Sequence, residues 1–333
     1  MFDRVPQALV IAVCAACLLL PLALGTDYTL FRLTLVATYA LAVLGLNLVM
    51  GFGGQISLGH GAFYAIGSYT TAILVVSYSV PYWATFPASA AVSGALGFLV
   101  GWPALRLTGP YLALVTLALA TAAPQILKHQ ALEPWTGGVQ GVLLSKPEPP
   151  FGLPLSPDQW LYVVAVVLAA IGFLLVSRLM RGRNGRAIIA VRDHALAAEA
   201  MGVDVARLKT RTFALSAMLT GVAGSVGALA VEFISPDSFT PFLSITLFVG
   251  AVVGGAASIL GAIAGAAFIV AVPPLASIVS KSAPGIAYGA MLILCLYVLP
   301  AGFAGLFKRR PVLAPRSASH VIQAKQGRSK HAA

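Results

Sequence analysis

The sequence has 333 residues, of which 59% are hydrophobic and only 9% are charged, and its mean hydropathy is +0.91. A soluble domain carries about 25% charged residues, so this composition excludes that class and indicates an all-α polytopic membrane protein. The strict alternation of a membrane β-barrel is absent. The net charge of +11 argues against nucleic-acid binding, because most basic residues fall in the predicted loops on one side of the membrane.

Charge-free windows predict about ten membrane-spanning helices, each needing roughly 20 apolar residues. In chain order the windows cover residues 5–26, 33–105 (three spans), 107–127, 159–177, 212–231, 238–280 (two spans) and 282–307. In the second window, two spans plus a re-entrant element at 51–61 are an alternative. The first window is interpreted as a retained span, with a cleaved signal peptide as the alternative.

The positive-inside rule places both termini in the cytoplasm. The predicted inner segments contain Arg4, Arg106, the basic segment 178–211 and the basic residues after 307, whereas four basic residues fall outside. The chain thus divides into a membrane domain, residues 1–307, and a basic tail, 308–333, that we expect to be disordered. Whether the tail contacts anionic lipid is left open.

The glycine-dense stretch 51–63 is a predicted break between two spans. Glycine is a poor helix former, and broken backbone is tolerated in a membrane only where protein or a water-filled cavity covers it. We therefore predict that this stretch lines a solute path. The candidate path residues here are Asn47, Gly53, Gly54, Gln55, Ser57, Gly59 and His60. For His60, a packed hydrogen-bonding role is favoured over a contact with the solute or a proton relay.

The outer loop 129–158 contains five prolines and the run Thr-Gly-Gly-Val-Gln-Gly at 136–141. An ordered external cap and a plain connector are both compatible with this composition.

The predicted span at 212–231 carries three glycines at three-residue spacing, which form a face suited to close helix packing. These are Gly221, Gly224 and Gly227.

An echo of the first glycine motif follows at residues 254–261. Gly254, Gly255 and Ser258 repeat the spacing of Gly53, Gly54 and Ser57. Paired interrupted segments in two halves of a transporter indicate a path between them, so these three residues are also candidates for the path. Chance similarity between two glycine-rich stretches is the alternative.

The cytoplasmic segment 178–211 contains two predicted short helices, about 185–192 and 194–201. Asp193 is the expected N-cap of the second helix and Gly202 its C-terminal stop. Asp204 is the expected cap of the helix that leads into the next span. Such a compact, capped element is typical of a docking site for a partner, and an ordinary amphipathic loop is the alternative.

Leu196 and Met201 can form the apolar contact side of this docking helix, and Glu199 its charged side. The chain carries no GxxxxGK[ST] phosphate loop and no HExxH motif. The predicted spans contain no Asp, Glu, Lys or Arg, groups that proton-driven transporters keep in the membrane. Energy is therefore expected from a partner, and a secondary transporter or channel is the competing class. A membrane enzyme is the least supported class.

The three cysteines, Cys14, Cys17 and Cys295, lie in predicted spans and are interpreted as packing residues. We therefore expect no metal site, no cofactor and no catalytic residues.

Four stretches of the chain resemble the permease subunits of ABC importers for branched-chain amino acids, of the LivM type. They are GLNL at 45–48 with the glycine stretch to residue 69, TGGVQG at 136–141, the run from 185 to 209, and the region 254–306. The resemblance implies a type II importer-like fold, a second LivH-like permease, cytoplasmic ATP-binding subunits and a periplasmic solute-binding protein in a bacterial inner membrane.

The resemblance also implies that a coupling helix contacts the ATPase. Its residues would be Asp193, Ala195, Leu196, Ala198, Glu199, Ala200, Met201 and Gly202. The solutes it implies are leucine, isoleucine and valine. Urea, short amides and other amino acids, which similar permeases carry, are alternatives.

Overall fold

The computed structural model describes residues 26–104, 109–150, 154–279, 284–299 and 302–307. The first half contains α2 (Asp27–Asn47), the π-helix η1 (Leu48–Phe52), α3 (His60–Ala72), the π-helix η2 (Ile73–Ser77), α4 (Tyr82–Ala104), α5 (Pro110–Leu127), α6 (Glu133–Thr136) and β1 (Val142–Leu143). The second half contains α7 (Pro157–Arg181), α8 (Arg183–Asp193), α9 (Ala195–Ala200), α10 (Val205–Val231), β2 (Phe233–Ile234), η4 (Pro236–Phe239), α11 (Pro241–Gly254), α12 (Gly261–Val279), α13 (Pro284–Val298) and α14 (Phe303–Phe307).

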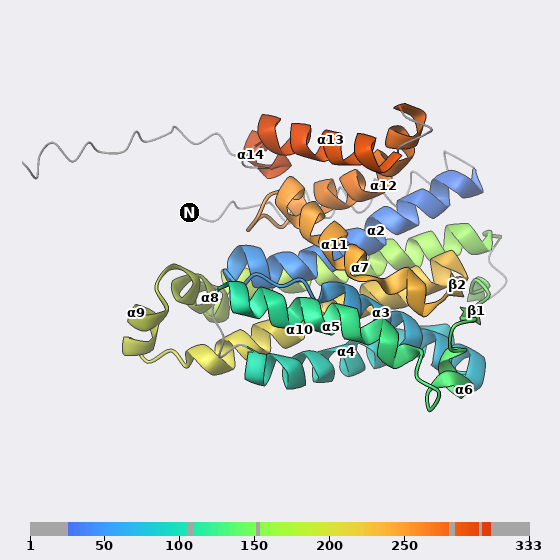
Figure 1. The fold of residues 1–333 in the computed structure, drawn as a ribbon, viewed down its shortest axis with the longest axis horizontal. Coiled ribbons are helices and arrows are strands. Elements are labelled where there is room, and N and C mark those ends of the chain that lie inside the picture. Colours follow the sequence, from blue (N-terminus) through green and yellow to red (C-terminus); the bar gives the residue numbers. More distant parts are fainter. Residues whose placement is uncertain (1–25, 105–108, 151–153, 280–283, 300–301, 308–333) are drawn as a thin grey trace, which may run out of the picture.

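Helices dominate the described residues, in agreement with the expected class (Figure 1). Within the described ranges, five helical segments are long and apolar enough to cross a membrane: 27–52, 82–102, 157–181, 205–231 and 261–278. α5 and α11 are shorter apolar helices. The count of about ten spans is therefore not confirmed, because glycine and proline interruptions divide the apolar windows into shorter pieces. The predicted first span, with Cys14 and Cys17, and the basic tail lie outside the described residues.

α10 occupies the centre of the bundle, where it packs against α2, α3 and α4. Its glycines allow this close approach. A Cβ at Gly221 would collide with Ser93 of α4, and one at Gly224 with the backbone of Tyr64 on α3. The predicted small-residue packing face is thus confirmed, and it serves contacts within this chain.

The two ends of the molecule carry different elements (Figure 1). α8 and α9 lie at one end, and α6, β1 and β2 lie at the other. β1 pairs with β2 in antiparallel register, with Val142 opposite Ile234. The predicted cytoplasmic segment and the predicted outer loop therefore lie at opposite ends of the bundle.

Candidate functional site

The glycine stretch is broken where the sequence predicts. η1 ends at Phe52, residues 54–59 have no regular secondary structure, and α3 begins at His60. Gly54 has φ +66°, a left-handed conformation that glycine adopts without steric cost. Gly54 and Ile56 are exposed, and the other predicted path residues of the stretch are buried: Gly53, Gln55, Ser57, Gly59 and His60. Most residues of the break are therefore buried inside the bundle.

Hydroxyl side chains from neighbouring helices hold the broken backbone. The hydroxyl of Thr116 on α5 accepts a hydrogen bond from the Leu58 N–H at 2.9 Å. The hydroxyl of Ser244 on α11 accepts one from the Gly61 N–H, also at 2.9 Å. Backbone donors that no helix satisfies thus find buried acceptors, as an apolar environment requires.

His60 is buried and hydrogen-bonded at both ring nitrogens. Ser216 of α10 donates its hydroxyl proton to the Gly45 carbonyl at 2.5 Å, so its oxygen accepts from His60 Nε2, 2.5 Å away. Nδ1 is then the acceptor for the hydroxyl of Ser57 at 3.0 Å. This pattern requires a neutral imidazole with its proton on Nε2, which matches the packed hydrogen-bonding role favoured from the sequence.

Asn47 joins the first glycine segment to the second. Its side-chain nitrogen donates to the Ser258 carbonyl at 2.7 Å, and its side-chain oxygen accepts from the Ala257 N–H at 2.9 Å. Asn47 is fully buried. Gly255 and Ala257 both have positive φ, so the second segment is also broken. The side chain of Asn47 therefore links the two glycine segments, with Gly254 and Gly255 buried and Ser258 half-buried.

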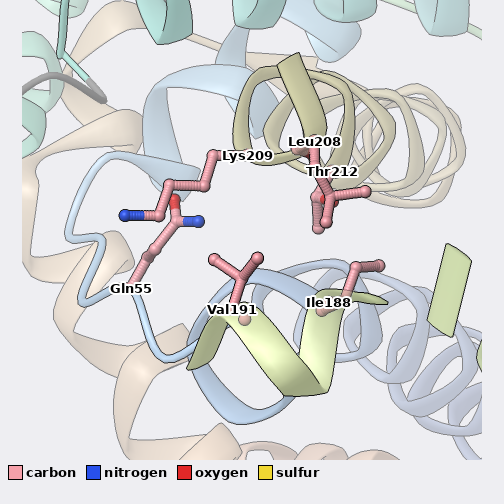
Figure 2. A pocket seen from close by; sticks show the side chains of 7 residues that line it. Gln55, Ile188, Val191, Leu208, Lys209 and Thr212 are labelled. Atoms are coloured by element: carbon pink, nitrogen blue, oxygen red, sulfur yellow. The ribbon is translucent and has the colours of Figure 1, made fainter. Parts of the chain in front are cut away.

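A cavity of about 10 Å³ lies between the break, α8 and α10 (Figure 2). It is lined by Gly53, Gln55, Ile188, Val191, Leu208, Lys209 and Thr212. Among the described residues, the side-chain oxygen of Gln55 is buried without a hydrogen-bond partner. An unsatisfied buried polar group costs roughly 1–3 kcal/mol. The polar side chain of the break therefore faces the cytoplasmic segment.

The two predicted cytoplasmic helices are α8 and α9 (Figure 1). The predicted cap at Asp193 is wrong. His194 occupies the N-cap position of α9 without a side-chain cap bond, and the Asp193 carboxylate instead accepts a hydrogen bond from Arg192 at 2.9 Å. Asp193 is the last residue of α8, and the extended backbone that an N-cap requires falls one residue later, at His194.

The predicted helix stop at Gly202 and the predicted helix cap at Asp204 are both confirmed. Gly202 has φ +85°, and its N–H donates to the Glu199 carbonyl at 2.9 Å, so it ends α9 as a left-handed stop. Asp204 caps α10 by accepting from the Arg207 N–H at 2.9 Å.

α9 presents two large apolar side chains to its surroundings. Leu196 is 83% exposed and Met201 is 87% exposed. Ala195 is half-buried, and the other expected coupling residues Glu199 and Ala200 are exposed. Ala198 is 6% exposed, so it packs α9 against its own chain. α9 therefore carries exposed apolar side chains, as the predicted docking helix requires.

The outer loop is tied to the end of α10 and to the start of α7. The Leu144 N–H donates to the Glu232 carbonyl at 2.6 Å, next to the β1–β2 pair. Lys146 Nζ lies 3.0 Å from Asp158 Oδ1 and 3.3 Å from Glu232 Oε2. Burial by itself lowers the pKa of the Lys146 ammonium, but hydrogen bonds and charge from Asp158 and Glu232 outweigh burial and raise this pKa. The described part of this loop is therefore ordered, as one of its two interpretations requires.

The family model for the permease component of branched-chain amino acid transport systems matches residues 28–299. The chain belongs to this permease family. The matched range includes the glycine break, the α8–α9 segment and the second glycine segment.

Curated relatives of this permease include LivM of Salmonella typhimurium, which is 34% identical over 261 residues, covering 71% of this chain and 61% of the relative. The chain thus spans less than two thirds of that relative. LivH of Salmonella typhimurium is 27% identical over 294 residues, covering 82% and 92% of the two chains. LivM of Methanocaldococcus jannaschii is 25% identical over 253 residues, covering 68% and 70%.

A solved structure, PsaBC from Streptococcus pneumoniae in complex with Fab, covers 88% of the permease and 100% of its own chain, with 15% identity and a TM-score of 0.45. A likeness at this level carries no argument about this permease.

Sequence reasoning missed several residues that shape the site of this permease. Thr116, Ser216 and Ser244 come from three different helices and hold the break. Each is one of several hydroxyl residues in its helix, so the sequence indicates buried polar contacts there but identifies neither the hydroxyl that makes them nor its partner. Arg192 was also missed, because it was counted with the other basic residues of the cytoplasmic segment.

Proposed function

We propose that this permease is a non-catalytic membrane subunit of an ATP-driven ABC importer. It would translocate branched-chain amino acids, leucine, isoleucine and valine, across a bacterial inner membrane. ATP hydrolysis would take place in cytoplasmic partner subunits. A second, LivH-like permease would complete the path, and a periplasmic solute-binding protein would deliver the solute.

The observation that carries this proposal is the exposed apolar pair on α9. Leu196 and Met201 lie on a short helix with a glycine stop, at the end of the bundle that carries the basic segment. Burying a leucine or methionine side chain contributes about 1.5–3 kcal/mol, enough for two such residues to anchor a helix in a partner's groove. The family match over residues 28–299 supports a transport role for this chain.

The solute path of the proposed importer runs beside the glycine break. Gly54 and Ile56 are the exposed residues there, and they are the first candidates for contact with the solute. Asn47, Ser57 and His60 are buried in contacts within the chain, so they would shape the path from behind. A Gly54→Leu variant would strain the left-handed backbone and displace the Arg192 stem, and we expect it to lower uptake.

The test begins with gentle purification of the full chain from its native membrane and mass spectrometry of the proteins that accompany it. The proposal expects a second permease and one or two chains with a phosphate loop. The isolated complex is then placed in liposomes, and ATP-dependent uptake of leucine, isoleucine and valine is measured against urea and short amides. Accumulation of solute by the chain alone, without ATPase subunits, would overturn the proposal. So would uptake that collapses with the proton gradient while ATP is maintained.

A further inference from the structure

Arg192 connects the cytoplasmic segment to the glycine break. It lies near the end of α8, directly before α9, and its Nη1 donates to the Gly51 carbonyl at 3.2 Å. Gly51 belongs to the last turn of η1, where helix carbonyls lack partners within their own helix. The guanidinium therefore supplies a hydrogen bond that the broken helix cannot make for itself.

The stem of Arg192 also packs against the break. A Cβ placed on Gly54 would lie 2.6 Å from Arg192 Cγ. Glycine at this position therefore gives the arginine stem room to cross the break. The aliphatic part and the guanidinium of Arg192 both contact residues 51–54, so this side chain fixes the position of α8 relative to the break.

Gly51 is at the same time in contact with the second glycine segment. A Cβ on Gly51 would collide with the side-chain oxygen of Asn47 and with the Ala257 nitrogen. Asn47 in turn holds Ala257 and Ser258 by its two hydrogen bonds. A continuous series of contacts thus runs from Arg192 through Gly51 and Asn47 to residues 257–258.

We propose that Arg192 is a positioning residue that holds both glycine breaks in one arrangement and transmits a displacement of α9 to them. The coupling part of this inference rests on the proposed function. The π-helical turn at η1 fits such a role, because π-turns inside helices are frequent at functional sites. Since α9 follows α8 after a single residue, His194, a partner that moves α9 also moves Arg192.

The linkage is tested by hydrogen–deuterium exchange on the full chain in lipid nanodiscs. Arg192→Gln is compared with Arg186→Gln, an exposed arginine on the same helix. We expect Arg192→Gln to speed exchange about tenfold at 51–59 and also at 255–261, because a lost charge-assisted hydrogen bond raises local opening by that order. Arg186→Gln should leave both segments unchanged. Unchanged exchange at 255–261 in Arg192→Gln would overturn the linkage, as would an equal rise in the Arg186→Gln control.

The coupling role is tested on the purified complex in liposomes. We expect Arg192→Gln to keep the partner subunits and ATP hydrolysis but to lower solute uptake per ATP about tenfold, since 1.4 kcal/mol corresponds to that factor. Parallel loss of hydrolysis and uptake, or unchanged values of both, would overturn the coupling role. If the unmodified complex shows no ATP-dependent uptake, the proposed function fails, and the exchange result still decides the linkage separately.

Discussion

Hydroxyl side chains form hydrogen bonds with backbone groups that the broken span leaves without helical partners. Residues 54–59 leave backbone groups without helical partners in an apolar bundle, where each unsatisfied group is costly. Thr116 and Ser244 supply acceptors from helices far away in the sequence. Ser216 supplies one to His60 and at the same time a donor to Gly45. Polar side chains inside apolar helices thus form hydrogen bonds with backbone groups of other elements.

Replacing Ser216 with alanine tests this role. The change leaves His60 Nε2–H without its acceptor and removes the hydroxyl donor to the Gly45 carbonyl, which still accepts from the Leu48 N–H. We expect the purified protein to lose roughly 1–3 kcal/mol of stability, the cost of an unsatisfied buried polar group. Thermal unfolding in detergent measures the loss, with Ser277→Ala, an exposed serine of α12, as the control. A melting temperature equal to that of the Ser277→Ala protein would contradict the assignment.

At the scale of elements, α9 combines residues with two different tasks. Ala198 is buried and packs the helix against its own chain, whereas Leu196 and Met201 extend away from it. Substitutions at these positions should therefore have separable effects. A bulky residue at Ala198 displaces the whole helix, and loss of the exposed pair removes a contact surface while leaving the helix in place.

The double variant Leu196→Ser, Met201→Ser is expected to fold normally but to bind ATPase subunits at least about tenfold more weakly, since each buried side chain contributes about 1.5–3 kcal/mol. Co-purification and titration with the ATPase measure the affinity. The double variant Val139→Ser, Leu143→Ser changes two exposed apolar residues at the opposite end of the bundle and serves as the matched control. Unweakened binding of the ATPase by the α9 double variant would contradict the docking assignment.

Glu199→Lys, which reverses an exposed charge on α9, is expected to uncouple ATP hydrolysis from solute uptake.

The outer loop depends on the ion cluster of Lys146. We expect Lys146→Met to loosen the β1–β2 pair, because it removes the partner of both Asp158 and Glu232. The pKa of Lys146 is raised in the folded protein. Its contribution is therefore fully present below the ordinary lysine pKa of about 10.4 and is lost as pH rises through the folded value.

Exchange of the Leu144 amide measures this loosening. The difference between Lys146→Met and the unmodified protein should be the same at about pH 6 and about pH 8, since both lie well below the lysine pKa. Lys128→Met serves as the comparison, because its ion pair with Asp237 is more exposed and surface pairs contribute little. A difference between the proteins that changes across this interval would show that another group controls the loop.

At the scale of the whole molecule, the bundle has two chemically distinct ends. α8 and α9 lie at one end, and the β1–β2 pair lies at the other. α8 and the adjoining ends of α7 and α10 carry most of the described basic residues. Because positive charge is retained on the cytoplasmic side of membrane proteins, we propose that the first end faces the cytoplasm. The glycine break lies toward this end, because Arg192 and the cavity beneath Gln55 join it to α8.

Cysteine labelling tests this orientation. In a chain whose Cys14, Cys17 and Cys295 are replaced by alanine, Leu196→Cys should react with an impermeant maleimide only after the cytoplasmic side is opened. Leu143→Cys, at the other end and 76% exposed, should react in intact cells with a permeable outer membrane. Labelling of both positions from the same side would refute the orientation.

The sequence by itself determined the membrane class, the position of the break, the basic segment 178–211, the helix stop at Gly202 and the helix cap at Asp204, because hydropathy, glycine propensity and capping act within a few residues. The failed cap at Asp193 shows the limit, since α8 extends through this residue and the N-cap position falls on His194. Only the tertiary structure decided that Asn47 reaches Ser258, that Ser216 bonds His60, and that Arg192 reaches Gly51. These pairs are separated by 211, 156 and 141 positions in the chain, and packing of whole helices brings them together. A side chain's need for a partner can be read locally, but the identity of the partner depends on how the helices pack.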